Sequence, residues 1–454
     1  MLREPGAASA PALTPRRILR LYWPLALSWL MMSVESPISV GLISRLPNAE
    51  VHTAAFLVLM GLALWIESPV IDLLATSTTL ASNSENTRRL TRFALTLMAW
   101  VTVAHAAVAL TPLYGVVTLG ILRLPPEVAE AGKGAFAIMI PWSGLIGWRR
   151  FLQGLMIRRH ETRLIGVGTM IRVTTMFGTG TAMYIVGRSA EFDVNSVNLV
   201  AVSLIASVAS EALFIHFAAR RAFREALVTP GVRDAEPLTL RRLAKFHFPL
   251  TVTTLVNLTA IPIVSAALAF SPDAVLALAG WQVALALLSP LRTVVFALPE
   301  VVITLLREAN AYRALQRFCF AVGAAMTLVG FAFAGLGLDR RYFIDVLGTS
   351  PAVADVAHIA VIAGAAMPIL SAMQCFLRGV LTYRHVTVAR LTAVVIGIVV
   401  LIASLVAGVA FRTPGAVLAP IAVMLSLGAE YVALALMARS RGGDGGAERI
   451  RTAE

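Results

Sequence analysis

The sequence of 454 residues is poor in charge. Asp, Glu, Lys and Arg together make up 14% of it, whereas 58% of the residues are hydrophobic. Soluble globular domains carry about 25% charged residues, so this chain has too little polar surface to cover a water-soluble globule of its size. A mean hydropathy of +0.80 agrees with that conclusion. These proportions indicate an integral membrane protein.

Cysteine and lysine are also scarce. The only two cysteines, Cys319 and Cys375, lie in apolar segments without a C-x-x-C or histidine-rich context. Neither a disulfide framework nor a metal site is therefore indicated, and both residues are expected to be structural. Lys133 and Lys245 are the only lysines among 38 basic residues, so the net charge of +13 comes from arginine.

Sequence motifs of enzymes are absent as well. The chain contains no P-loop of the form G-x-x-x-x-G-K-[ST], no zinc-binding H-E-x-x-H and no G-x-S-x-G elbow. ATP-driven pumping by this chain alone and hydrolytic catalysis are therefore not expected, and no cofactor is implied. The arginines are scattered over many loops instead of forming one basic face, which argues against nucleic acid as a partner.

Apolar segments recur from one end of the chain to the other. A transmembrane helix needs about 20 mostly apolar residues, and twelve segments meet that length. The pattern predicts an all-α polytopic membrane protein with twelve transmembrane helices. The predicted spans are 22–44, 54–82, 93–120, 134–157, 164–187, 195–219, 246–270, 274–306, 318–337, 353–382, 388–411 and 415–438.

The basic residues alternate between strongly and weakly basic connections. Cytoplasmic loops are enriched in Lys and Arg, and 26 of the basic residues fall in the tails and alternate loops on one side, against 7 on the other. Both termini are therefore predicted to be cytoplasmic, in a multi-pass protein of the cell membrane of bacterial inner-membrane type. The first 21 residues do not have the pattern of a cleaved signal peptide.

The chain contains an internal repeat. A shift of 225 residues aligns FLQGLMIRRHET (151–162) with FLRGVLTYRHVT (376–387), and Pro24-Leu25 with Pro249-Leu250. The predicted organisation is a tail (1–21), a six-helix bundle (22–219), a connector (220–245), a second six-helix bundle (246–438) and a tail (439–454). Because six is even, the two repeats are parallel, and such repeats place a substrate path between the halves. This duplication favours a transporter working by alternating access.

Acidic residues inside the spans are the first candidates for function, because polar groups in the hydrocarbon region are costly and mark functional sites by default. Glu35 and Glu67 each begin a Glu-Ser-Pro triplet, and Asp72 follows in the same span as Glu67. Proline frees a carbonyl one turn back, so each triplet combines a kink, an acceptor and a carboxylate. These acids and His105 are candidates for proton or ion coupling. The structural alternative is that the acids pair with buried arginines and hold helices together.

Buried arginines and amides are the second set of candidates. Arg172 and Arg292 lie deep in the first and second halves, and a guanidinium binds carboxylate or phosphate through two parallel hydrogen bonds. An anion held between them is one interpretation, and ion pairs with the deep acids are the other. Asn257 and Gln282 are further substrate-binding candidates. Weaker candidates nearer helix ends are Arg149, Arg150, Arg378, Glu211, Glu300 and Glu430.

The plan of the chain resembles the multidrug/oligosaccharidyl-lipid/polysaccharide (MOP) exporter superfamily and its multidrug and toxic compound extrusion (MATE) branch. The resemblance rests on two parallel six-helix halves, an entry at Tyr22-Trp23-Pro24-Leu25 and a Phe-Leu-x-Gly helix ending in a basic turn. Within the superfamily the sequence is most similar to the progressive ankylosis protein family, through Tyr22 to Leu25, the Pro69-x-x-Asp72 spacing and the apolar run 400–406.

That resemblance implies a V-shaped pair of bundles, acting as a monomer in the lipid bilayer on a small-molecule substrate. It implies export of organic anions such as citrate, a nucleotide or pyrophosphate. The multidrug branch implies instead a proton- or sodium-coupled antiporter of organic cations, with an acid in the first helix, where Glu35 lies. A flippase for lipid-linked precursors and a non-transporting membrane scaffold are the remaining alternatives.

Overall fold

The structure is a computed structural model, and it describes residues 13–159, 161, 163–189, 194–229, 238–306, 308, 311–384 and 386–440. The described residues form helices and connections, with no strand among them. His160 and His385 of the two basic turns, and most of both predicted tails, lie outside the described residues.

The first half of the chain builds six membrane segments, several of which are broken into two helices. Its elements are α1 (Pro15–Ser33), α2 (Glu35–Ile43), α3 (Ala49–Ile71), α4 (Leu73–Leu80), α5 (Ser84–Leu110), α6 (Leu113–Gly115), the π-helix η1 (Val116–Ile121), α7 (Pro126–Ile138), α8 (Trp142–Arg158), α9 (Arg163–Ser189), α10 (Ser196–Ala218) and the short amphipathic α11 (Arg220–Val228).

The second half follows the same order. Its elements are α12 (Leu240–Ala269), α13 (Ala274–Thr293), the 3₁₀-helix η2 (Val294–Ala297), α14 (Leu298–Leu305), α15 (Ala311–Gly335), α16 (Leu338–Arg341), the π-helix η3 (Tyr342–Val346), α17 (Pro351–Gly364), α18 (Met367–Tyr383), α19 (Thr387–Ala410) and α20 (Gly415–Ser440).

The length and composition of these helices make the chain a multi-pass membrane protein. In the described ranges nine helical stretches are long and apolar enough to cross a membrane, and α17 with α18, bent by 42°, makes a tenth. The other two predicted spans correspond to α7–α8 and α9, which carry Arg149, Arg150 and Arg172 and are therefore less apolar. The fold is all-α, with two six-helix bundles.

One predicted span is wrong in its second part. A single helix over 93–120 was expected, but α5 ends at Leu110 and the chain continues through α6 and η1. The hydroxyl of Thr111 donates to the Ala107 carbonyl, 2.7 Å away, and Pro112 follows without an N–H. Proline cannot extend the hydrogen-bond ladder of the preceding helix, so the helix stops there. The connector 220–245, expected only as a polar stretch, contains α11.

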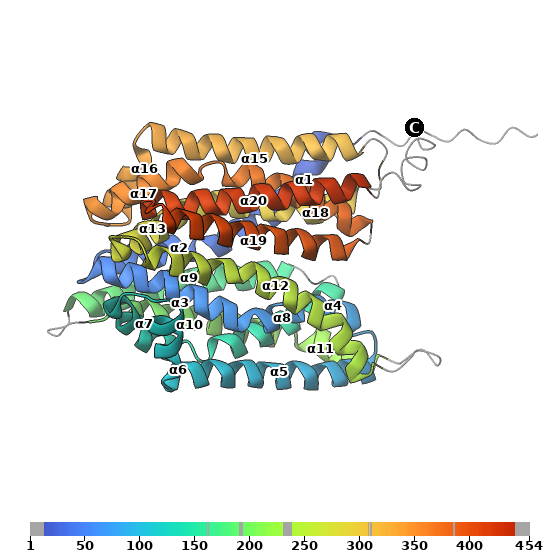
Figure 1. Ribbon diagram of the computed structural model, residues 1–454. Coiled ribbons are helices and arrows are strands. Elements are labelled where there is room, and N and C mark those ends of the chain that lie inside the picture. The colour runs from blue at the N-terminus through green and yellow to red at the C-terminus, as the bar shows by residue number, and fades with distance from the viewer. Residues whose placement is uncertain are drawn as a thin grey trace, which may run out of the picture.

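The two bundles lie side by side with α3, α12 and α13 between them, while α5 and α15 lie at the two outer edges (Figure 1). The chain enters and leaves the described fold at the same end of the helices, called here the terminal end. At this end α1 packs into the second half: Ile18, Tyr22 and Ala26 join its apolar cluster, and the Tyr22 hydroxyl donates to the Val294 carbonyl at 3.1 Å.

The internal repeat is visible in the packing of two glycines. A Cβ placed on Gly154 would lie 1.9 Å from Ser77 Oγ and 2.5 Å from the Leu74 carbonyl oxygen. A Cβ placed on Gly379 would lie 2.8 Å from Val302. Gly379 and Val302 follow Gly154 and Ser77 by the same 225 residues. The fourth helix of each half therefore approaches the second helix at the same point, where a Cβ on the glycine would lie within 3 Å of the second helix.

The irregular segments of the helices repeat as well. The second span breaks at Asp72 in the first half, and its counterpart breaks over η2 in the second. The π-helices η1 and η3 also lie at corresponding positions. The break at Val34 between α1 and α2 has no such partner, since α12 runs unbroken through Pro262. The first span alone has been opened at its Glu-Ser-Pro triplet.

Direct contacts tie the halves together at the end opposite the termini. The Arg45 guanidinium, just after α2, donates to the carbonyls of Gly41 (2.7 Å), Leu347 (3.1 Å) and Val346. Leu347 and Val346 are at the end of η3, where carbonyls lack helical partners and attract a cation. Glu50 of α3 also accepts a hydrogen bond from Ser350 at 2.7 Å. Arg45 therefore closes this end across the two halves.

Candidate functional site

The structure gathers most of the deep charges of the first half into one cluster of buried and half-buried side chains. The cluster draws on α2, α3, α8, α9 and α10, and it lies beside the breaks of the first two spans at Val34 and Asp72. We call it the charge cluster. Its members are Glu35, Glu67, Asp72, Arg149, Arg150, Arg172 and Glu211.

Glu35 and Arg172 form a two-pronged ion pair within the charge cluster. Arg172 donates through Nε to Glu35 Oε1 and through Nη2 to Oε2, the latter at 2.6 Å. Both residues are buried, and the guanidinium also lies 5.9 Å from the ring centre of Trp142. A second carboxylate, Glu211, lies 3.6 Å from Arg172 Nη1. The charge of Arg172 is therefore compensated inside the protein.

Glu211 connects α10 to α8. It accepts hydrogen bonds from Arg149 and, at 3.4 Å, from Gln153 one helical turn further along. The second half has the matching tie with the order reversed. Arg378, which corresponds to Gln153, pairs with Glu430 of α20, whereas Gln374, which corresponds to Arg149, donates to the Leu427 carbonyl at 2.7 Å.

Glu67 and Asp72 differ from the other acids because each keeps an unpartnered oxygen. Among the described residues, Glu67 Oε2 and Asp72 Oδ2 are buried and have no hydrogen-bond partner. Glu67 interacts electrostatically with Arg149, Arg150 and Arg172, but forms no ion pair with them. Burying a carboxylate oxygen without a partner is costly, and such an oxygen is free to accept a proton or to contact a cation.

Asp72 also faces the second half. It occupies the break between α3 and α4, and Thr254 of α12 contacts its carboxylate. His247 of α12 lies beside the same break, with Nε2 donating to the Pro69 carbonyl at 2.9 Å and Nδ1 2.8 Å from the Thr76 hydroxyl. The break in the second span is therefore contacted by two residues of α12, the first helix of the other half.

Arg292 is the deep arginine of the second half, and it is placed differently from Arg172. Its Nε donates to the Ser371 hydroxyl at 2.9 Å, and its guanidinium lies 5.5 Å from the ring centre of Phe296. No carboxylate lies within ion-pair distance in the part of the chain that the structure describes. Arg292 thus carries a positive charge without a compensating neighbour.

The remaining sequence candidates lie apart from one another. Gln282 donates to the Ser36 hydroxyl at 3.3 Å and so links α13 to α2 across the halves. Asn257 is exposed on α12. His105 lies within the first bundle, where it donates to the Phe136 carbonyl at 3.0 Å and stacks on the Phe136 ring. Neither Asn257 nor His105 joins the charge cluster.

Sequence reasoning gave too little weight to Arg149, Glu211 and His247. Depth measured from a helix end placed the first two near the interface, but both are almost fully buried by neighbouring helices. The spacing Arg149-x-x-x-Gln153, repeated as Gln374-x-x-x-Arg378, puts a cation and an amide on one helix face in each half. That pattern was the available signal. His247 carried no signal in the sequence.

The donor set does not suggest a metal centre. Within the described ranges, no group of three or more His, Cys, Asp or Glu side chains is arranged to hold a metal ion. Both cysteines are buried and free.

Comparison with known proteins supports the fold. No known protein family and no curated protein matches the sequence. Among solved structures, an inward-facing multidrug resistance MATE family transporter of the MOP superfamily aligns with a TM-score of 0.69 at 13% identity, over 92% of this chain and 97% of that one. An outward-facing multidrug resistance MATE family transporter of the same superfamily aligns with a TM-score of 0.62 at 14% identity, over 96% of each chain.

A third solved structure is a MOP superfamily transporter from Pyrococcus furiosus, described as having a binding pocket of reverse polarity. It aligns with a TM-score of 0.65 at 15% identity, over 93% of this chain and 95% of that one. The chain therefore has the fold of the MATE transporters. Its similarity to the progressive ankylosis family stays a prediction.

Proposed function

We propose that the protein is a secondary active transporter in which Glu67 and Asp72 bind the coupling proton or cation and Arg292 binds an anionic group of the substrate. The two halves alternate access to the two sides of the membrane. Both termini face the cytoplasm of a bacterial-type cell, and the chain acts as a monomer without enzymatic activity or a prosthetic cofactor.

One observation carries the proposal: the deep charges are compensated unequally. Arg172, Glu35 and Glu211 satisfy one another, whereas Glu67 and Asp72 keep unpartnered oxygens. Costly unpaired groups in a membrane are retained where they serve a pathway. Asp72 lies at a helix break that contacts the other half, and Glu67 lies five residues before it in α3, so their occupancy can bias the position of that half.

The unequal arginines support an anionic substrate. Arg172 is held by Glu35, while Arg292 has only a hydroxyl and an aromatic ring beside it. A guanidinium without a carboxylate partner is suited to bind carboxylate or phosphate from a ligand. Gln282, which donates to Ser36 of the first half, supplies an amide between the halves. Together with the resemblance to the progressive ankylosis family, this favours export of organic anions such as citrate, a nucleotide or pyrophosphate.

The alternative is a proton- or sodium-coupled antiporter of organic cations. The observation that favours it is the same pair of unpartnered acids, since a ligand cation is attracted to Glu67 and Asp72 if it enters the space beside them. In that case Arg292 has no role in binding, and neutralising it leaves transport unchanged or faster.

Transport by purified protein in proteoliposomes distinguishes the two. Labelled citrate or nucleotide is compared with a labelled organic cation under an imposed proton or sodium gradient. We expect anion transport driven by the gradient and at least about tenfold slower in Arg292→Gln, because a charge-assisted hydrogen bond contributes about 1.5–3 kcal/mol.

A matched control is Arg188→Gln, which neutralises an equally long side chain whose hydrogen bond and ring contact, within the described ranges, are with Tyr184. Transport of the cation alone supports the alternative. If neither substrate moves under either gradient, the transporter proposal is wrong.

A further inference from the structure

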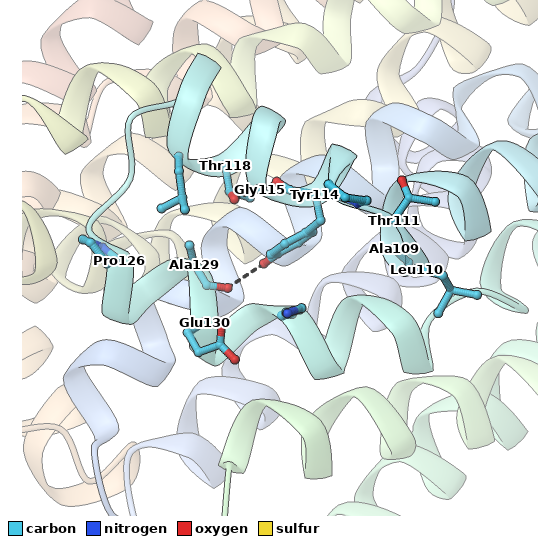
Figure 2. A pocket seen from close by; sticks show the side chains of 12 residues that line it. Ala109, Leu110, Thr111, Tyr114, Gly115, Thr118, Pro126, Ala129 and Glu130 are labelled. Carbon is cyan, nitrogen blue, oxygen red and sulfur yellow. Dashed lines mark hydrogen bonds between the residues drawn. The ribbon is translucent and has the colours of Figure 1, made fainter.

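A pocket of about 480 Å³ opens at the end opposite the termini, outside the charge cluster. It lies between α6–η1 on one side and α7 on the other, and the Tyr114 ring reaches from one to the other (Figure 2). The Tyr114 hydroxyl donates to the Ala129 carbonyl at 2.9 Å. Two exposed charged residues of α7, Glu130 and Lys133, line the pocket. Its volume is within the range of small-ligand sites.

The corresponding place in the second half is filled by ion pairs. The 225-residue offset relates four residues around the pocket to four residues of the second half. Tyr114, Gly115, Glu130 and Lys133 correspond in that order to Asp339, Arg340, Asp355 and His358. There the buried Asp339 pairs with His358 at 2.7 Å, and Arg340 pairs with Asp355. Each charged residue of α17 therefore has a partner on α16.

The first half lacks residues equivalent to Asp339 and Arg340. Tyr114 replaces the carboxylate and directs its hydroxyl to a backbone carbonyl, while Gly115 replaces the arginine with no side chain at all. Among the described residues, neither Glu130 nor Lys133 has an ion-pair partner. A carboxylate and an ammonium, three residues apart and thus on one helix face, therefore line this pocket, whereas the corresponding residues of the second half form ion pairs.

The rim of the pocket is apolar and exposed. Leu110 is 69% exposed and Leu119 48% exposed, and both line the pocket beside the charged pair. Large apolar side chains exposed on a membrane protein contact acyl chains. The site thus joins a charged pair of both signs to a lipid-facing surface, which is the charge and polarity pattern of a zwitterionic amphiphile.

We propose that this pocket binds a phospholipid with a phosphoethanolamine headgroup, in the leaflet opposite the termini. Lys133 contacts the phosphate, Glu130 accepts hydrogen bonds from the primary ammonium, and the acyl chains lie along Leu110 and Leu119. A primary ammonium donates hydrogen bonds to a carboxylate, whereas a quaternary choline has no N–H, so the carboxylate selects the former. This site is independent of the proposed transport mechanism.

The proposal is tested by native mass spectrometry of the full-length protein, delipidated in detergent and titrated with phosphatidylethanolamine, phosphatidylcholine or phosphatidylglycerol of equal chain length. We expect phosphatidylethanolamine to be retained about tenfold more strongly than either of the others, as charge-assisted hydrogen bonding implies. Glu130→Gln and Lys133→Met should each remove that preference.

Comparison of the two halves suggests the most specific test variant. Gly115→Arg restores the residue type of Arg340 opposite Glu130, and a Cβ at Gly115 meets no atom within 4 Å. It should abolish the preference. Gly120→Arg adds the same charge five residues further along, in the π-helix η1 that follows α6. Gly120 is equally open but does not line the pocket, so this variant should retain the preference.

Thermal unfolding of each variant confirms that it is folded, and Lys133→Met replaces Gly115→Arg if the latter is not. Three results overturn the proposal: equal retention of the three lipids by the wild type, equal effects of Gly115→Arg and Gly120→Arg, or binding of soluble glycerophosphoethanolamine as tight as that of the lipid. The last would assign the site to a soluble zwitterion.

Discussion

The guanidinium of Arg172 and the carboxylate of Glu35 bind each other through two parallel hydrogen bonds, 137 residues apart in the chain. This pair joins the first span, at the break beside its Glu-Ser-Pro triplet, to the fifth span. Glu211 extends the connection to the sixth span. The arginine that was a candidate for substrate binding therefore holds the first bundle together.

Removing one member of this pair should strongly destabilise the protein. Arg172→Ala leaves the Glu35 carboxylate uncompensated in the interior, which costs about 3–5 kcal/mol in comparable buried pairs, while Glu211 keeps its pair with Arg149. The measurement is the free energy of unfolding in detergent micelles, by denaturant titration. Arg221→Ala is the control, because Arg221 pairs with Glu225 on the surface at 80% side-chain exposure and should cost less than about 1 kcal/mol. Equal losses in both variants contradict the assigned role.

Neutralising Glu67 should affect transport without loss of stability. In Glu67→Gln the unpartnered buried charge is gone, so the free energy of unfolding should be equal to or greater than that of the wild type. Gradient-driven uptake into proteoliposomes should fall by about tenfold or more, within the usual range of coupling energies. Glu85→Gln, at an exposed helical pair with Arg89, is the control. A variant that is less stable yet fully coupled speaks against Glu67 as an ion site.

Arg45→Ala should open the end opposite the termini. Two carbonyl acceptors of the other half, on Val346 and Leu347, lose their donor, a loss of about 2 kcal/mol at about 1 kcal/mol per hydrogen bond. Spin labels at Leu113→Cys and Leu338→Cys, in a chain with Cys319→Ser and Cys375→Ser, report the separation of the halves. Longer distances should gain population in the variant, and Arg188→Ala should not change them. An unaltered distance distribution would show that Arg45 does not determine closure.

The repeated glycines should tolerate alanine to different degrees. Gly154→Ala forces a methyl group against Ser77 and a backbone carbonyl and should cost about 1–3 kcal/mol. Gly379→Ala meets the Val302 side chain at 2.8 Å, which can shift, and should cost less. Gly178→Ala, where a Cβ meets nothing within 4 Å, should stabilise α9 by up to about 1 kcal/mol. The reverse order of unfolding midpoints would exclude this packing.

The fold was largely predictable because the membrane imposes the length and polarity of each helix. Apolar segment length and the 225-residue offset predicted the helices of both halves, and the same offset relates Gly154 to Gly379 in space. The failure beyond Leu110 has a local cause, since the apolar composition continues while Pro112 ends the helix. Hydropathy reports burial in lipid and is insensitive to a single missing N–H.

The charge cluster was predictable only in part. The sequence identified Glu35, Glu67, Asp72 and Arg172 as deep charges, but partner choice depends on the rotation of each helix about its axis, which hydropathy does not encode. Arg172 therefore had several possible acids and in the structure binds Glu35. His247 was missed because its partners are backbone and hydroxyl groups of a break in another helix.

The reversed order of arginine and glutamine between α8 and α18 has a meaning for the history of the chain. If both halves descend from one duplicated unit, the cation moved by one helical turn in one copy while the tie to its glutamate was kept. Such a move passes through an intermediate with two cations or none at the two positions. Selection has then acted on the link between the fourth and sixth helices, while the position of the arginine on the fourth helix changed. Distant homologues are better sought by this compensated pair than by either residue alone.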